Sequence, residues 1–194
     1  MKNFSLSLFI IILTISTLNA QFTKIGGGAG LSSGYQFHQV DLEYNRSGHI
    51  NANLRGIYEI SLPLHISPSF TFFAPHLYKQ YDTKITVNTM MFDINGHYVF
   101  NSLDRFEFYG LAGLDVLLAW KREKFTGTNI SGTLKESDNA IGLNLGVGSY
   151  MKLTDQFDLY LEAKYLLSKY DQFMLTAGVL LNIDWLMKHE NTDL

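Results

Sequence analysis

Long stretches of this chain alternate apolar and polar residues with a period of two. In Asn51–Leu62, for example, Leu54 and Ile60 lie on one face, and Asn53 and Arg55 lie on the other. Successive side chains of a β-strand point to opposite sides, so this pattern predicts strands with one face in apolar surroundings. The same alternation recurs in Thr23–Leu31, Ser67–Ala74, Thr89–Phe100, Phe106–Trp120, Asn139–Tyr150, Phe157–Leu167 and Phe173–Ile183.

The number and length of these segments narrow the fold class. Together they predict eight strands of around nine to fifteen residues, whereas strands of soluble proteins average about five or six. A tilted strand that crosses a membrane needs about nine to eleven residues. We therefore expect an all-β fold, an eight-stranded antiparallel up-and-down transmembrane β-barrel.

The predicted connections alternate in length. Short links are expected at Pro63–Ile66, Asn101–Arg105, Lys152–Gln156 and Ser168–Asp171, a medium one at His76–Thr83, and long ones at Ser32–Gly48 and Lys121–Asp138. Short turns on one side and longer loops on the other are typical of an outer-membrane barrel whose termini face the periplasm.

Aromatic residues gather near the predicted strand ends, where two interfacial girdles are expected. The periplasmic group is Tyr58, Tyr98, Phe100, Phe106, Phe108, Tyr150 and Phe157, and the outer group is Phe72, Tyr78, Tyr81, Trp120, Phe125, Tyr165 and Phe173.

The two ends of the chain differ from the alternating part. Residues 1–20 combine Lys2, a 13-residue apolar stretch from Leu6 to Leu18 and a small residue at Ala20, which predicts a cleaved secretory signal peptide. Residues 21–184 are assigned to the barrel, and residues 185–194 to a short periplasmic C-terminal extension. Localisation in the outer membrane of a Gram-negative bacterium follows.

Alternation alone does not say which face points inward. A soluble lipocalin-like barrel would put the apolar face inside, but the GxW motif of its first strand is absent, and only 17% of residues are charged. Charges of both signs occur in mid-strand on the polar face, where they can neutralise one another in a narrow lumen. We therefore expect a polar lumen network of Arg55, Glu59, Asp93, His97, Glu107, Asp115, Glu162 and Lys164.

Three segments resemble the OmpA-like/OmpX-like outer-membrane β-barrel domain family. They are Phe108–Gly113 (FYGLAG), Gly142–Tyr150 (GLNLGVGSY) and Leu159–Tyr165 (LYLEAKY). The resemblance covers residues 21–184 and implies an eight-stranded barrel with a closed, polar lumen. Many such barrels end on a terminal aromatic residue, whereas this chain continues beyond Trp185.

Known catalytic and cofactor patterns are missing. There is no Cys for a disulfide, a thiol nucleophile or a Cys-based zinc site, and Gly26–Gly30 lacks the spacing of a phosphate loop. His65 and Ser67 fall near a predicted periplasmic turn. No catalytic residue, cofactor or metal is predicted; a weaker metal hypothesis places His38 and His49 together at the outer rim, with Asp41 and Glu43 nearby.

These observations favour a non-enzymatic outer-membrane protein with a structural or surface-interaction role through its outer loops. The alternatives are a lipid-modifying barrel enzyme, a small pore, and a secreted soluble barrel that binds an apolar ligand. The expected partners are outer-membrane lipid, the barrel assembly machinery and an unidentified extracellular ligand. The net charge of −3 argues against binding of nucleic acid.

Overall fold

The computed structural model describes residues 22–37, 46–47, 49–126 and 131–183. The predicted signal peptide, residues 1–20, and the predicted extension, residues 185–194, lie outside these residues. No helix in the described ranges is long and apolar enough to cross a membrane. The barrel strands are β1 (Lys24–Ser32), β4 (Ile50–Ser61), β5 (Leu64–Gln80), β6 (Thr83–Leu103), β7 (Phe106–Thr126), β8 (Ser131–Lys152), β9 (Phe157–Leu167) and β10 (Gln172–Asn182).

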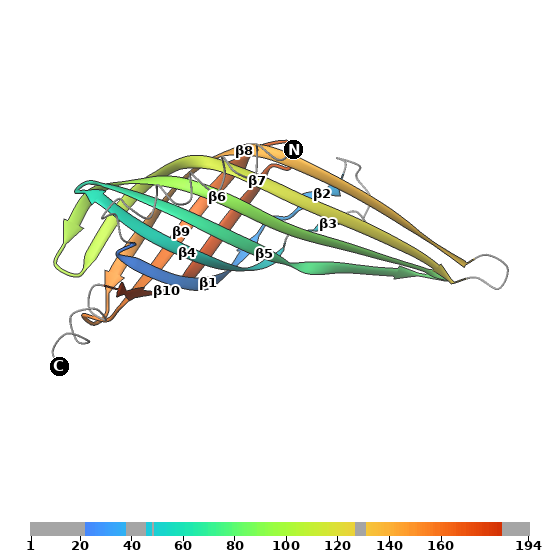
Figure 1. Cartoon of the computed structure of the whole chain (residues 1–194), viewed down its shortest axis with the longest axis horizontal. Coiled ribbons are helices and arrows are strands. Elements are labelled where there is room, and N and C mark those ends of the chain that lie inside the picture. The colour runs from blue at the N-terminus through green and yellow to red at the C-terminus, as the bar shows by residue number, and fades with distance from the viewer. Residues whose placement is uncertain (1–21, 38–45, 48, 127–130, 184–194) are drawn as a thin grey trace, which may run out of the picture.

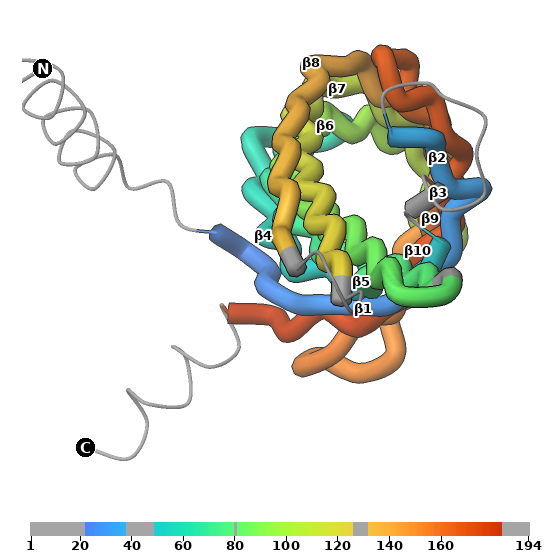
Figure 2. The backbone as a smooth tube through the Cα atoms, turned by 90° about the vertical axis from the view of Figure 1, so that its right-hand side faces the viewer, coloured from blue at the N-terminus to red at the C-terminus, as the bar shows by residue number. Residues whose placement is uncertain are grey.

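These eight strands form one closed antiparallel barrel (Figure 2). Each strand pairs with its neighbour in sequence, and β1 closes the sheet by pairing with both β10 and β4. Two short strands, β2 (Tyr35–Gln36) and β3 (Arg46–Ser47), pair with each other in the connection between β1 and β4. The expected eight-stranded up-and-down barrel is confirmed.

The alternating side chains point as the sequence predicts. Leu114, Leu145 and Leu161 expose 60%, 51% and 51% of their surface on the outside of the barrel. Their polar neighbours Asp115, Asn144 and Glu162 are at most 1% exposed, because they point into the lumen. A closed sheet with an apolar exterior and a polar interior is suited to lipid rather than to water. This orientation argues against the soluble barrel with an apolar cavity.

Four strands continue well past the rest of the barrel (Figure 1). Strands β6, β7 and β8 contain 21, 21 and 22 residues, whereas β9 and β10 contain 11 each. The partners of β8 on β9 begin only at Leu143, so residues 131–142 of β8 pair with β7 alone. We call the part of β5–β8 beyond Phe72 and Trp120 the extracellular extension, since the opposite barrel end carries the short turns and the ends of β1 and β10.

The extension corrects two predicted loops. His76–Thr83 and Lys121–Asp138 are mostly strand, and the β5–β6 connection is the two-residue turn Tyr81–Asp82. The reason is that paired neighbours continue the hydrogen-bonded ladder even where the side chains are charged on both faces. A polar segment without an apolar face reads as a loop in sequence, although its backbone can be fully paired.

Prolines interrupt β5 without ending it. Pro75 lies at a register shift between Phe73 and His76 in the pairing with β6. Opposite Pro68, the pairing between β4 and β5 is interrupted between Arg55–Ser69 and Tyr58–Ile66, although the register is the same on both sides. Proline has no N–H to donate, so the ladder is locally broken at each site while the neighbouring strands hold β5 in place.

Candidate functional site

A buried ion pair links opposite walls of the barrel. Arg55 on β4 donates from Nη1 and Nη2 to the two carboxylate oxygens of Glu162 on β9, over 2.7 and 2.9 Å. The Tyr109 hydroxyl donates to the same carboxylate over 3.1 Å, and the guanidinium lies 4.3 Å from the ring centre of Tyr160. Both charged side chains are 1% exposed. The bidentate contact therefore compensates two charges that water does not reach.

A second pair lies beside the first. Lys164 Nζ is 3.0 Å from Asp93 Oδ2, and Ser69 and Asn95 donate to the other oxygen of Asp93 over 2.8 and 2.6 Å. Lys164 Nζ also lies 3.9 Å from Glu162 Oε1. The two ion pairs therefore form one continuous network through the middle of the lumen.

His97 joins this network through aromatic side chains. Its ring stacks on Tyr109 with centroids 4.4 Å apart, and its Nδ1 is 2.6 Å from the Tyr150 hydroxyl. The placement of Tyr150 in a membrane-facing girdle is wrong, because this residue is buried inside. The alternation contained the signal, since Tyr150 shares the face of Asn144. Tyr78, also assigned to a girdle, packs against buried residues inside.

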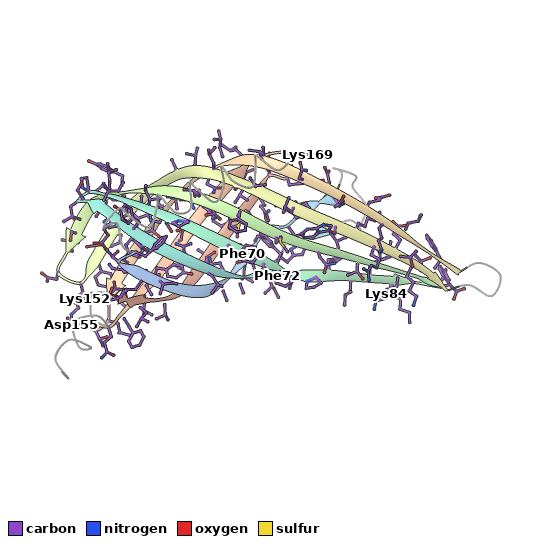
Figure 3. The ribbon with its side chains drawn as sticks, viewed as in Figure 1. Phe70, Phe72, Lys84, Lys152, Asp155 and Lys169 are labelled. Carbon is purple, nitrogen blue, oxygen red and sulfur yellow. The ribbon has the colours of Figure 1, made fainter. Side chains whose placement is uncertain are left out.

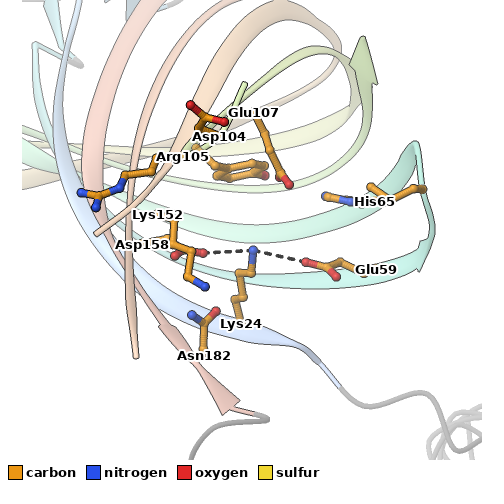
Figure 4. Close-up of a pocket in the computed structure, with 11 residues that line it drawn as sticks. Lys24, Glu59, His65, Asp104, Arg105, Glu107, Lys152, Asp158 and Asn182 are labelled. Carbon is orange, nitrogen blue, oxygen red and sulfur yellow. Dashed lines mark ion pairs between the residues drawn. The ribbon is translucent and has the colours of Figure 1, made fainter. Parts of the chain in front are cut away.

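Two predicted network residues lie at the periplasmic opening instead. Glu59 and Glu107 line a cavity of about 300 Å³ there (Figure 4). Lys24 lies between Glu59 and Asp158, with its Nζ 3.3 and 3.0 Å from their carboxylates. In the adjacent turn (Figure 3), a hydrogen bond from Lys152 lowers the pKa of Asp155.

Asp115 is inside the barrel but is not joined to the others by a hydrogen bond. Its side chain is buried, and neither carboxylate oxygen has a donor among the residues that the structure describes. Of the eight residues predicted for the lumen, the structure thus brings Arg55, Asp93, His97, Glu162 and Lys164 into direct contact.

Glycines make room for the inner tyrosines. Gly148 lies opposite Tyr109 on the neighbouring strand, and a Cβ at Gly148 would come within 2.4 Å of the tyrosine ring. A Cβ at Gly28 would likewise approach the Tyr160 hydroxyl to 2.3 Å. The glycine run near the N-terminus therefore serves packing of the interior, as the missing phosphate-loop spacing suggests.

A side chain at Gly148 should weaken the lumen network. We expect Gly148→Val to push Tyr109 away from Glu162 and to cost about 1–3 kcal/mol of unfolding free energy, as overpacking does. Urea unfolding in lipid vesicles measures this change. Gly132→Val is the control, since a Cβ there meets no atom within 4 Å; an equal loss in both variants would contradict the role of Gly148.

The outer half of the lumen contains an apolar cluster to which Tyr35 of β2 and Phe37 contribute, and we call these two residues the lid. Tyr35 of β2 packs on Tyr170 with ring centroids 4.6 Å apart, and its hydroxyl is 2.5 Å from the Thr89 hydroxyl. Phe37 is fully buried in the same cluster, which also contains Phe73. The sequence interpretation took Ser32–Gly48 as a loop and missed this lid, although Tyr35 and Phe37 are themselves spaced by two.

An ion pair joins the turn between β9 and β10, on which Tyr35 packs, to β8. The Asp138 carboxylate, on the inward face of β8, accepts hydrogen bonds from Lys169 and from the Tyr170 hydroxyl. Burial alone would raise the pKa of Asp138, but these hydrogen bonds lower it to about 2. The turn between β9 and β10 is therefore held against the base of the extension at neutral pH.

The residues weighed for catalysis or metal binding do not form such a site in the described part of the chain. His65 and Ser67 are both buried on the lumen side of β5. No group of three or more His, Cys, Asp or Glu is arranged around a common point within the described ranges. His38, with Asp41 and Glu43, lies outside the described residues.

The closed strands, apolar exterior and ion-paired interior define a transmembrane β-barrel protein. The sequence profile described as "Outer membrane protein beta-barrel domain" matches residues 5–182, so the chain belongs to this family. The protein therefore lies in the outer membrane, with lipid around its apolar face. Comparison with curated protein sequences gives no match.

Solved structures share the fold at low sequence identity. The Ail protein of Yersinia pestis is 18% identical, with a TM-score of 0.53 over 83% of this chain and 100% of that one. A major outer membrane protein from Thermus thermophilus is 15% identical, with a TM-score of 0.58 over 81% of this chain and 98% of that one. A second structure of Ail contains the heparin analogue sucrose octasulfate and gives 20% identity and a TM-score of 0.53, over 81% and 97% of the two chains.

Proposed function

We propose that the protein is a non-enzymatic outer-membrane protein that acts through contacts of its extracellular extension at the cell surface. The observation that carries this proposal is the length of β6–β8, which have 21 or 22 residues each. A strand needs only about nine to eleven residues to cross the membrane. The remaining residues build a paired sheet with charges of both signs above the outer leaflet, where other molecules can reach it.

The lumen network has a structural role in this proposal. An eight-stranded barrel is only wide enough for its own side chains, and here ion pairs and tyrosines fill the middle while Tyr35 and Phe37 cover the outer end. A filled interior favours a rigid anchor over a pore. We expect the barrel assembly machinery to insert it, as for other barrels of the outer membrane.

The position of the polar side chains supports a non-enzymatic role. A lipid-modifying barrel needs a nucleophile and a base at its membrane-facing surface. His65 and Ser67, the nearest such pair in sequence, both point into the lumen, where a bilayer lipid has no access. The binding of a heparin analogue by the structurally similar Ail supports testing sulfated polysaccharide as a first ligand for this chain.

Removal of the tip of the extension tests the proposal. Residues 123–134 are replaced by Asn-Gly, because Arg122 and Lys135 pair directly and a two-residue turn can join them. Cells that display the intact protein should be retained several-fold better than vector cells on heparin-coated or gelatin-coated surfaces, and the shortened variant should fall to the vector level.

The matched control changes the opposite end of the barrel. Replacement of the periplasmic turn residues Asp104 and Arg105 by Asn-Gly should leave retention unchanged. Heat-dependent electrophoretic mobility checks that all variants are folded in the membrane. Equal retention of cells with the intact and the shortened protein would contradict a surface-contact role of the extension.

A further inference from the structure

The outward face of β7 changes character along its length. Going toward the extension, alternate residues are Leu114, Val116, Leu118 and Trp120, and then Arg122 and Lys124. The first four are apolar and face lipid, with the tryptophan at the depth where aromatic rings meet the headgroups. The outward-facing residues of β7 thus change directly from lipid-facing apolar side chains to exposed cations.

The neighbouring strands add cations on this side. Together with Arg122 and Lys124, the exposed residues Lys79 of β5, Lys84 of β6 and Lys135 of β8 form what we call the outer basic face. In Figure 3, Lys84 lies beyond the lipid-facing Phe70 and Phe72 along the extension. The described strand residues on this side of the extension include no Asp or Glu.

The register places these charges against one another. Lys79 lies opposite Lys84, Lys84 opposite Lys124, and Arg122 opposite Lys135. Like charges directly opposite each other destabilise a sheet. None of the five has an ion-pair partner in the part of the chain that the structure describes. Anions from outside the protein would relieve the repulsion between these neighbouring cations.

The acidic residues of the extension lie on the other side of the sheet. Glu123 and Glu136 have carboxylate oxygens 2.5 and 4.0 Å from Nζ of Lys121, and Asp138 pairs with Lys169. Charge is therefore divided between the two faces, with paired charges toward the barrel axis and unpaired cations toward the surrounding lipid.

A groove of about 490 Å³ joins the basic residues to the apolar belt. Phe72, Met90 and Trp120 form its apolar part. Its charged part contains Arg122 and Lys135, together with Lys121 and Glu136, which lie 4.0 Å from each other. Arg122 follows Trp120 by two positions on β7, and two positions along a strand span about 7 Å. A hydrocarbon chain on the aromatic side and a phosphate between the two cations match this division.

We propose that the outer basic face and this groove bind phosphate groups of lipids in the outer leaflet of the same membrane. The depth just beyond Trp120, and the lateral rather than apical direction of the side chains, favour a lipid over a soluble polyanion. This inference rests on the barrel's place in the membrane and is independent of the proposed surface contacts.

Nanodiscs of phosphatidylcholine with and without bisphosphorylated lipid A test the proposal. Added lipid A should raise the urea midpoint of the intact protein, and lipid A without its phosphates should not. Arg122→Gln/Lys135→Gln should weaken the apparent affinity for lipid A about tenfold, since each interfacial cation contributes a substantial attraction to anionic lipid. Arg122→Lys, which keeps the charge, should retain most of it.

The control pair Arg105→Gln/Lys152→Gln removes the same charge at the periplasmic end. An equal loss in both pairs would mean general electrostatic attraction and would overturn the proposal. Soluble heparin provides the other arm: a basic-face variant that loses heparin binding but keeps the lipid A effect would also overturn it. If the double variant folds poorly, Lys84→Gln/Lys124→Gln, further along the face, replaces it, with a smaller loss expected.

Discussion

Replacement of Arg55 by methionine should lower the free energy of unfolding by about 3–5 kcal/mol, the cost of removing one partner of a buried ion pair. Arg55 supplies both donors of the two-pronged contact with Glu162, and methionine fills a similar volume without replacing them. The carboxylate would keep Tyr109 at 3.1 Å and Lys164 at 3.9 Å. Urea unfolding in lipid vesicles, followed by tryptophan fluorescence, measures the loss.

The partner variant separates the ion pair from simple packing. Arg55→Met/Glu162→Met should be more stable than Arg55→Met alone, because it leaves no charge without its partner and Lys164 keeps Asp93. The exposed pair at the periplasmic turn is the control, since Lys152→Met there should give no measurable change. Additive losses from the two single changes at Arg55 and Glu162 would show that the pair is not coupled.

Introduction of a charge on the lipid-facing side should have the next largest effect. Leu145→Arg places a cation among the apolar residues Leu143 and Val147, far from either end of the membrane-spanning part of β8. An Arg or Lys at the bilayer midplane of a barrel costs about 2–4 kcal/mol. We expect the same urea experiment to show this loss, together with less folded protein in the membrane.

The control introduces the same charge on the same face of β8, but at the level of the lipid headgroups. Ser137 lies on the same outer face of the same strand, opposite Trp120 at the level of the headgroups. Ser137→Arg should change stability by less than about 1 kcal/mol, because a cation near the interface keeps contact with water and phosphate. Similar losses at both positions would argue against a lipid-facing exterior.

The alternation of side chains determined the main architecture. Leu114 and Asp115, or Leu161 and Glu162, are adjacent in sequence, and a strand must send them to opposite faces. Since only closure of the sheet satisfies every edge in a membrane, eight such strands implied a barrel with the charges inside. The fold class, the outward leucines and the inward position of Arg55 and Glu162 followed from this local rule together with the strand lengths and the mid-strand charges of both signs.

Only the tertiary structure decided which inward residues meet. Arg55 and Glu162 are 107 positions apart in the sequence. Alternation tells which face of the sheet each of them occupies, but their contact depends on the stagger of the strands, which alternation does not contain. For the same reason Asp115 and Glu107, on the correct face, lie outside the central network. The extension was also hidden, because Lys121–Asp138 is polar and its strand structure comes from pairing with neighbours rather than from its own side chains.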